Sequence, residues 1–234
     1  MDACFGACSS SQTAFSEGGR RLLRLSPWER FRRRWGTGSA SDVEPAFGGE
    51  SLPQKILGLH RAFSEHDIAH AFGGAIALAY HAEPRATDDI DINILMAPDR
   101  GEDVIAALDG LFQIADRDEQ LRMIATRDQA RVLWGATYVD LFFMDTAFHE
   151  SLATRVGAVD FGGEEIAIIS AEDLVVCKAL FNRPHDWVDI QRIAKIQGAG
   201  LDRSYVEHWL RFFVDDADTI LDRFRQVHGE DPAS

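Results

Sequence analysis

The sequence has no long hydrophobic run and little cysteine. No apolar stretch in its 234 residues approaches the roughly 20 residues of a membrane-spanning helix, and no hydrophobic signal core follows Met1. The three cysteines, Cys4, Cys8 and Cys177, are odd in number, and Cys4-x-x-x-Cys8 lacks the partner ligands of a zinc site. These absences argue against a membrane span and a disulfide framework. They predict a cytoplasmic protein in a reducing compartment, without a structural metal.

Positive charge is also in short supply. Lysine and arginine together number 24 against 38 aspartates and glutamates, which gives a formal net charge of -14. The bulk surface should therefore repel nucleic acid, and a polyanionic substrate would need a local basic patch. With 46% hydrophobic residues, the chain can bury a core, in one domain or in a core with a helical appendage.

A basic patch does occur in residues 20–35. Ser26, Pro27 and Glu29 form a capping box with proline at the first helical position, which predicts a helix over residues 26–35. Arginines surround its apolar stripe of Trp28, Phe31 and Trp35. This basic helix suits an anionic surface such as RNA or membrane lipid, but its aromatic side chains can also dock onto the acidic body of the same protein. Residues 1–53 are thus predicted to be an N-terminal extension that ends in a linker over 36–53; a transit-like presequence also fits.

Residues 89–96 alternate polar residues with isoleucine at 90, 92 and 94, a period of two that is typical of a half-buried strand. Asp89, Asp91 and Asn93 then share one face. At a rise of roughly 3.3 Å per residue, the Cα atoms of the two aspartates lie about 6.6 Å apart, so their oxygens can converge on one hard cation. The strand is therefore predicted to bind a divalent metal ion.

The acidic strand has two other interpretations. A calcium loop of the EF-hand type needs glycine at its sixth position and glutamate at its twelfth, and these are Ile94 and Arg100 here. The EF-hand is therefore excluded. A solvated strand face with acids at a loop edge is the remaining alternative.

A glycine pair precedes the acidic strand. Residues 67–72 are predicted to form a short strand that leads into Gly73 and Gly74, and residues 75–80 the helix that follows. Glycines at a strand-to-helix turn let a phosphate approach the backbone and the positive end of the helix dipole. The pair by itself also fits tight packing, but together with Asp89 and Asp91 it indicates a phosphate site.

The glycine pair, a helix and then Asp89-x-Asp91 on the next strand resemble the signature of the DNA polymerase β type nucleotidyltransferase superfamily. The form Arg85-x-Thr87-x-Asp89-x-Asp91 is similar to that of bacterial nucleotidyltransferases that include the abortive-infection toxins of type IV toxin–antitoxin systems. The superfamily implies a third carboxylate on a later strand, and Asp140 lies in the otherwise apolar run 138–144. An acid in such a run is costly unless it is paired or bound to metal, so a structural salt bridge is the alternative there.

The resemblance covers about residues 68–193, because a lysine helix with Lys178 and an Asp-x-x-Asp helix look like later motifs of the toxin-related group. It implies that the metal ligands are Asp89, Asp91 and Asp140, and that Lys178 joins them in catalysis. Nucleotide binding is expected at Gly73, Gly74, Arg85, Thr87, Asp186 and Asp189. A solvated helix lysine is the alternative for Lys178, and capping and pairing along a helix is the alternative for His185, Asp186 and Asp189.

Strands and helices alternate first, and helices then take over. Strands are expected over residues 67–72, 89–96, 121–126, 131–134 and 137–144, with a hairpin over 156–161 and 165–169. Helices are expected over residues 54–63, 75–80, 102–112, 171–181, 184–197, 203–213 and 215–227. We predict an α+β fold, in which a small mixed β-sheet core over 54–170 is flanked by helices and closed by a C-terminal helical bundle over 171–234.

The resemblance implies an enzyme that uses Mg²⁺ or Mn²⁺ and moves a nucleoside monophosphate from a nucleoside triphosphate to an acceptor hydroxyl, releasing pyrophosphate. The toxin-like group implies RNA such as tRNA as acceptor and a cognate antitoxin protein as partner, which the basic helix supports. The acidic surface would instead attract a small cationic molecule, as in the aminoglycoside nucleotidyltransferases. A non-catalytic relative with a binding or regulatory role is the third hypothesis, and the presence of all three acids counts against it.

Overall fold

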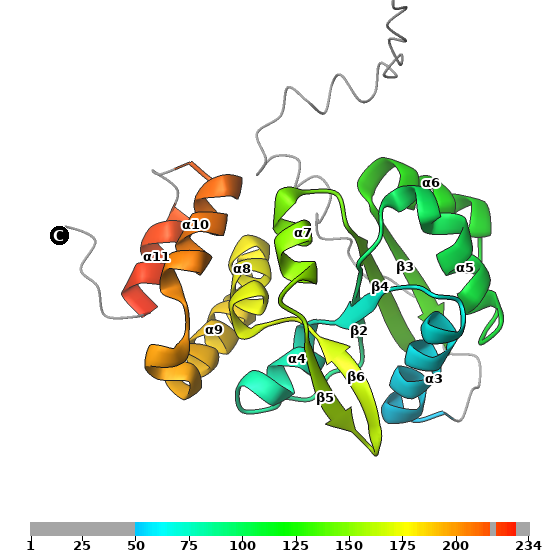
Figure 1. Cartoon of the computed structure of the whole chain (residues 1–234), viewed down its shortest axis with the longest axis horizontal. Coiled ribbons are helices and arrows are strands. Elements are labelled where there is room, and N and C mark those ends of the chain that lie inside the picture. Colours follow the sequence, from blue (N-terminus) through cyan, green and yellow to red (C-terminus); the bar gives the residue numbers. More distant parts are fainter. Residues whose placement is uncertain (1–49, 216–218, 228–234) are drawn as a thin grey trace, which may run out of the picture.

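The computed structural model describes residues 50–215 and 219–227, which form a twisted sheet with helices around it and a group of helices at one side (Figure 1). The basic helix predicted over residues 26–35 and most of the predicted linker lie outside the described residues. No helix of the described part is long and apolar enough to cross a membrane.

The described strands make one six-stranded sheet in the order β3-β4-β2-β1-β6-β5. The pairs β1/β6 and β2/β4 are parallel and the other three pairs are antiparallel, so the sheet is mixed, as predicted. The strands are β1 (His70–Phe72), β2 (Ile90–Ile94), β3 (Gln129–Trp134), β4 (Thr137–Phe143), β5 (Gly157–Phe161) and β6 (Glu164–Ile168).

Strand β2 lies in the middle of the sheet, and its composition explains its place. Ile90, Ile92 and Ile94 are fully buried in the core, whereas Asp91 between them is only partly buried. Asn93 is buried as well, so the polar face of the strand is more enclosed than a solvated strand face would be. The alternation predicted over residues 89–96 is confirmed, with the strand itself ending at Ile94.

Helices of the first part surround this sheet. Helix α3 is capped by Ser51, whose backbone N–H donates to Gln54 Oε1 at 2.8 Å, and it begins at Leu52, two residues before the predicted start. The helices of this part are α3 (Leu52–Glu65), α4 (Gly74–His81), η1 (Pro98–Arg100), α5 (Gly101–Asp109), α6 (Arg117–Arg127) and α7 (Ala147–Ala153).

Besides shifts of a few residues in the bounds of elements such as β1 and α5, two differences from the prediction concern whole elements. The strand expected over residues 121–126 is wrong, because this stretch belongs to α6. Asp116 caps that helix by accepting a hydrogen bond from the Glu119 backbone N–H at 3.2 Å, and the leucine, methionine, alanine and arginine that follow are good helix formers. Helix α7 was not predicted; Thr146 caps it, and Phe148 and Leu152, spaced by one turn, bury its inner face.

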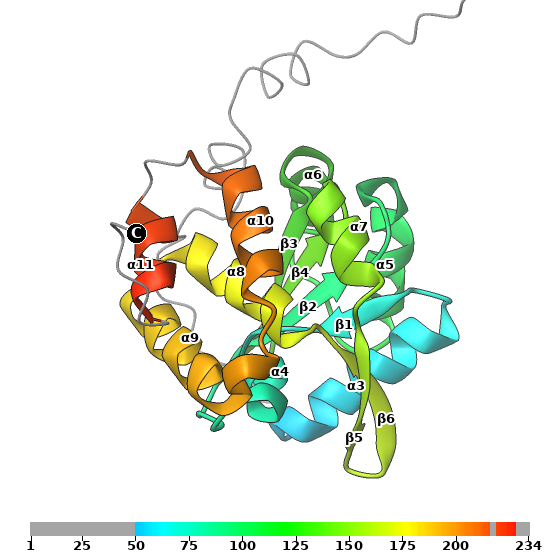
Figure 2. The same cartoon turned by 60° about the vertical axis from the view of Figure 1, so that its left-hand side comes forward.

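The C-terminal region is helical, as predicted: α8 (Ala171–Phe181), α9 (Pro184–Gln197), η2 (Gly198–Gly200), α10 (Arg203–Phe213) and α11 (Thr219–Val227). The bounds of α8, α9 and α10 agree with the sequence prediction to the residue. Helix α8 packs against α9, α10 and α4, and so joins the helical region to the sheet (Figure 2). The predicted α+β fold is therefore confirmed, whereas the division at residue 171 stays a prediction.

Candidate functional site

The glycine pair lies directly against the acidic strand. The Gly73 backbone N–H donates to the Asp91 carbonyl at 2.8 Å, which extends the antiparallel pairing of β1 with β2 into the turn. Gly74 has a φ of +51°, and a Cβ built on it would lie 1.8 Å from Asp91 Oδ2. Only glycine satisfies both the backbone conformation and the close approach of the carboxylate. The structure thus places Gly73, Gly74 and Asp91 at one point, where β1 ends and α4 begins.

Asp140 joins this region from β4. Strands β2 and β4 are parallel, and Asp91 and Asp140 are partners in their register. Both carboxylate oxygens of Asp140 accept hydrogen bonds from Arg131 on β3, from Nε at 2.6 Å and from Nη2 at 2.8 Å. The salt bridge that was the alternative interpretation of Asp140 is therefore present, and it does not remove Asp140 from its position beside Asp91.

Burial and the charge of Asp140 raise the proton affinity of Asp89 and Asp91. Burial, followed by the charge of Asp140, raises the pKa of Asp91 to about 6. Burial and then Asp140 also raise the pKa of Asp89, which precedes β2. Carboxylates held together in a half-buried position are destabilised in their charged form, and a bound cation relieves that repulsion.

These acids suit a divalent cation in their chemistry, because Mg²⁺ and Mn²⁺ prefer carboxylate oxygen. Their present geometry is not that of a closed ligand set: within residues 50–215 and 219–227, no group of three or more acidic, histidine or cysteine side chains is arranged to hold a metal ion. Asp91 approaches Gly74, whereas Asp140 is turned to Arg131. The metal requirement is therefore part of the proposal below.

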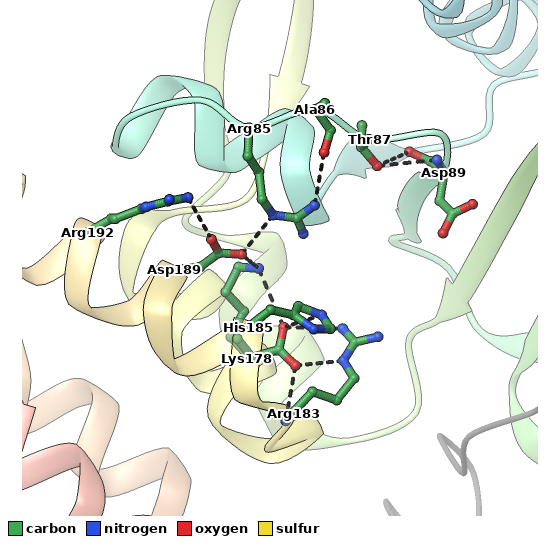
Figure 3. Close-up of polar contacts among 10 residues, drawn as sticks. Arg85, Ala86, Thr87, Asp89, Lys178, Arg183, His185, Asp189 and Arg192 are labelled. Carbon is green, nitrogen blue, oxygen red and sulfur yellow. Dashed lines mark hydrogen bonds and ion pairs between the residues drawn. The ribbon is translucent and has the colours of Figure 1, made fainter.

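A second charged group lies on α8 and α9 (Figure 3). Lys178 is buried, its Nζ donates to Asp189 Oδ2 at 2.7 Å, and it lies 3.6 Å from Asp186 Oδ1. Both aspartates are buried too. Burial alone would raise the pKa of Asp189, but Lys178 and then Arg85 outweigh it and the net pKa is lowered. The interpretation of Lys178 as a solvated surface lysine is wrong, because helix α8 is covered on almost every side.

Arginines surround these two buried aspartates. Arg85 Nε donates to Asp189 Oδ2 at 3.1 Å, Arg192 Nη1 donates to Asp189 Oδ1 at 3.5 Å, and Arg183 Nε donates to Asp186 Oδ2 at 2.6 Å. Figure 3 shows Arg85, Lys178 and Arg192 all directed at the carboxylate of Asp189. The two aspartates of the Asp-x-x-Asp helix are thus capped and paired, but their partners come from three different segments of the chain.

Thr87 and His185 have peripheral positions. The Thr87 hydroxyl accepts from the Asp89 backbone N–H at 3.2 Å and donates to the Asp89 carbonyl at 3.1 Å, so Thr87 shapes the entry to the acidic strand. His185 is exposed, and its Nε2 lies 3.7 Å from Asp186 Oδ1. In Figure 3, Thr87 and Asp89 lie apart from the cluster around Asp189.

One pocket connects the glycine turn with the charged helices. Its lining residues are Gly73, Gly74, Arg85, Asp91, Asn93, Phe142, Ile169, Leu174, Cys177, Lys178, Phe181, Arg183 and Asp186. Six of the predicted site residues are therefore brought together here, namely Gly73, Gly74, Arg85, Asp91, Lys178 and Asp186. Asp89, Asp140, Thr87 and Asp189 are not among the lining residues.

Two arginines of this region were missed in the sequence. Arg131 opposes Asp140 in the β3/β4 register, a pairing that no local pattern reveals. Arg183 stands directly before Pro184, five residues after Lys178, and its position between the two motif helices was the available signal.

No protein-family model and no curated relative matches this sequence. Among solved structures, the chain is similar to a crystal structure of ANT(2″)-Ia in complex with adenylyl-2″-tobramycin, with a TM-score of 0.49 and 14% identity over 76% of this chain and 99% of that one. It is similar to a solution structure of the antibiotic-resistance factor ANT(2″)-Ia, with a TM-score of 0.41 and 11% identity over 76% and 89%. It is also similar to an antigenic nucleotidyltransferase-like protein from Paracoccidioides brasiliensis, with a TM-score of 0.43 and 13% identity over 76% and 94%. Likenesses this distant leave the activity of this chain to its own residues.

Proposed function

We propose that the chain is a nucleotidyltransferase, an enzyme that moves a nucleoside monophosphate from a nucleoside triphosphate to an acceptor hydroxyl and uses Mg²⁺ or Mn²⁺. The observation that carries the proposal is the contact of Gly74 with the Asp91 carboxylate, with Asp140 beside it in register. In this arrangement, a glycine turn whose backbone can bind phosphate lies next to acids that a cation would stabilise.

Asp89, Asp91 and Asp140 are the residues proposed to hold the metal. When bound, a divalent ion neutralises phosphate oxygens and lowers the pKa of a coordinated hydroxyl. The backbone at Gly73 and Gly74 is proposed to support the triphosphate, because neither glycine has a side chain of its own that would keep a phosphate away from the backbone. Asp140 is the acid proposed to lie nearest the acceptor, and its separation from Arg131 would accompany metal binding.

In the reaction the acceptor oxygen forms a bond to the α-phosphorus of the nucleoside triphosphate. The bond between that phosphorus and the oxygen bridging to the β-phosphate breaks, and pyrophosphate leaves with the electron pair. The acceptor's proton passes to water. The protein's contribution to such a transfer is positioning and charge stabilisation rather than covalent chemistry.

Arg85, Lys178 and Asp186 are proposed to form a charged wall of the nucleotide site, with Asp189 as the ion-pair partner of Lys178 and Thr87 outside the lining. The Lys178 ammonium already donates to Asp189. Its proposed role is to fix the positions of these charged side chains and to add positive charge to the site. This differs from a mobile lysine that reaches a phosphate by itself.

Two classes of acceptor fit the proposed reaction, RNA and a small hydroxylated molecule. The spacing Arg85-x-Thr87-x-Asp89-x-Asp91, with Lys178 after it, supports a place beside the abortive-infection toxins, with RNA as acceptor and a cognate antitoxin as partner. The net charge of -14 supports a small hydroxylated cation instead. We favour the small acceptor slightly, because the charge describes the whole chain whereas the basic helix is one segment of it.

The test is a screen of ATP, GTP, CTP and UTP with Mg²⁺, against total tRNA and a panel of small hydroxylated acceptors, some of them cationic. We expect label transfer with release of one pyrophosphate per transfer, lost on addition of EDTA and in Asp91→Asn. If wild-type protein neither binds nor consumes any of the four triphosphates with Mg²⁺ or Mn²⁺, the proposed function is wrong.

A further inference from the structure

The pocket contains two cations from the α8–α9 region, and they differ in what they can offer a ligand. Lys178 has a side chain that is only 5% exposed, and its ammonium donates to Asp189. Arg183 also lines the pocket, but its side chain is 44% exposed. A ligand entering the pocket therefore meets the Arg183 guanidinium without first breaking a buried ion pair.

Arg183 is held in one orientation by its neighbours. Its Nε and Nη2 donate to the two oxygens of Asp186, at 2.6 Å and 3.2 Å, and its guanidinium lies over the Phe181 ring at 4.6 Å. A guanidinium has five N–H donors, and Asp186 uses the edge formed by Nε and Nη2. The donors of Nη1 remain directed away from Asp186, in a group whose orientation is already fixed before a ligand binds.

The charges around Arg183 favour an anion. The side chains of Arg85, Lys178, Arg183 and Arg192 surround the two buried carboxylates of Asp186 and Asp189, so the cluster has a surplus of positive charge. Arg183 and Asp91 line the same pocket. An anion bound at Arg183 would therefore share this pocket with Asp91, one of the proposed metal ligands.

We infer that Arg183 is a phosphate-binding residue, which contacts the triphosphate of the nucleotide in the pocket between the glycine turn and helix α9. This inference rests on the proposed function and adds to it a residue to which the sequence analysis assigned no role. A guanidinium on a phosphate makes charge-assisted hydrogen bonds, often two in parallel, which suit it better than a lysine for this contact.

Arg192 provides a matched control. It lies on α9, whose N-cap residue is Arg183, pairs with the other buried aspartate of the cluster and is similarly exposed, at 37%. Unlike Arg183, it is not among the residues that line the pocket. A comparison of Arg183→Gln with Arg192→Gln thus separates phosphate contact from the general loss of one positive charge and of one ion pair to a buried carboxylate.

The experiment is isothermal titration of full-length protein in Mg²⁺ without acceptor, using whichever of the four triphosphates binds wild type most tightly, and inorganic triphosphate as a second titrant. Circular dichroism melts check folding. We expect Arg183→Gln to weaken the affinity for both titrants by about tenfold or more, and Arg192→Gln to change it by less than about twofold. Arg183→Lys, which keeps the charge but not the paired donors, should fall between wild type and Arg183→Gln.

The outcomes separate the inference from the function. If wild type binds the nucleotide and Arg183→Gln binds it as Arg192→Gln does, the inference is wrong and the proposed function stands. If Arg183→Gln loses affinity for the nucleotide but not for inorganic triphosphate, the contact is with the nucleoside and the phosphate assignment is overturned. If wild type binds none of the four triphosphates, the proposed function and the inference both fail.

Discussion

Asp91 on β2 and Asp140 on β4 occupy the same register position on adjacent parallel strands. Neighbouring strands lie about 4.8 Å apart, and register partners in a parallel pair point to the same face, so the two carboxylates are neighbours although they are distant in sequence. Arg131 opposes Asp140 from β3 and balances one of the two charges. The sheet thereby assembles an acid pair and its counter-charge from three strands.

The acidic strand gives the first prediction. We expect Asp91→Asn and Asp89→Asn each to lower nucleotidyl transfer by about 100-fold or more, since each removes a proposed metal ligand at nearly constant volume. Transfer is measured by label incorporation and folding by circular dichroism. Asp88→Asn is the control, because Asp88 is exposed and adjacent. Wild-type turnover in Asp91→Asn would remove the metal assignment.

The second prediction concerns the glycine turn. In Gly74→Ala, the new Cβ would meet Asp91 Oδ2 at 1.8 Å, and φ of +51° is strained for alanine by about 1–2 kcal/mol. We expect lower thermal stability and loss of transfer, because the carboxylate must move. Gly162→Ala is the control: its φ of +65° brings similar backbone strain, but nothing lies within 4 Å of its Cβ. Equal transfer in the two variants would show that the Asp91 contact is irrelevant to activity.

Lys178 is the subject of the third prediction. Removing it takes away the shared cation of the buried carboxylates of Asp186 and Asp189, which keep their arginine partners, so we expect Lys178→Ala to lower the free energy of unfolding by about 1–3 kcal/mol, measured with urea. Lys195→Ala, at an exposed position of α9, should change it by less than about 0.5 kcal/mol. A Lys178→Ala protein as stable as Lys195→Ala would mean that the buried network contributes little.

The fourth prediction is a pH dependence at β1. Burial lowers the pKa of His70; its Nδ1 is assigned as the donor to the Ile68 carbonyl at 2.8 Å, and its Nε2 lies 3.1 Å from His60 Nδ1. An unfolded histidine titrates near a pKa of about 6.5, so below that pH the unfolded chain takes up a proton that folded His70 does not. The contribution of His70 to stability is therefore complete above about pH 6.5 and decreases as the pH falls toward its depressed folded pKa.

Urea unfolding between pH 5 and 8 measures this dependence. We expect His70→Gln to flatten the loss of stability below pH 6.5, and His66→Gln, at an exposed position after α3, to leave the slope as in wild type. The same slope in His70→Gln as in wild type would show that His70 is not the group responsible.

The fifth prediction separates the acceptor classes through the N-terminal extension. The net charge of -14 opposes a polyanion, so we favour a small acceptor. With a small acceptor, we expect deletion of residues 1–36 to leave transfer nearly unchanged. If the acceptor is RNA, the deletion should weaken tRNA binding, and each lost phosphate contact should lower the magnitude of the log–log salt slope by about 0.7 to 0.9. Filter binding at several salt concentrations distinguishes the two results. Loss of tRNA labelling by a folded deletion protein would favour RNA.

Local chemistry determined much of the fold. The bounds of α8, α9 and α10 could be predicted because Ser170, Pro184 and Asp202 mark their starts and the apolar residues that follow recur at helical spacing. The alternation in β2 and the glycine pair before α4 are likewise local signals. They placed Asp91 on a strand and Gly74 at a turn without any knowledge of what surrounds them.

Only the tertiary structure decided which neighbours those residues have. The cap at Asp116 and the burial of Ile124 made residues 117–127 a helix although their apolar residues also suited a strand. The register of β4 against β2 and β3 placed Asp140 between Asp91 and Arg131. The packing of α8 among α4, α9 and α10 buried Lys178 and left Arg183 at the pocket. Strand register and helix packing depend on residues far apart in the chain, whereas periodicity and caps act within a few residues, and this is why the sequence alone could name the acids but not their partners.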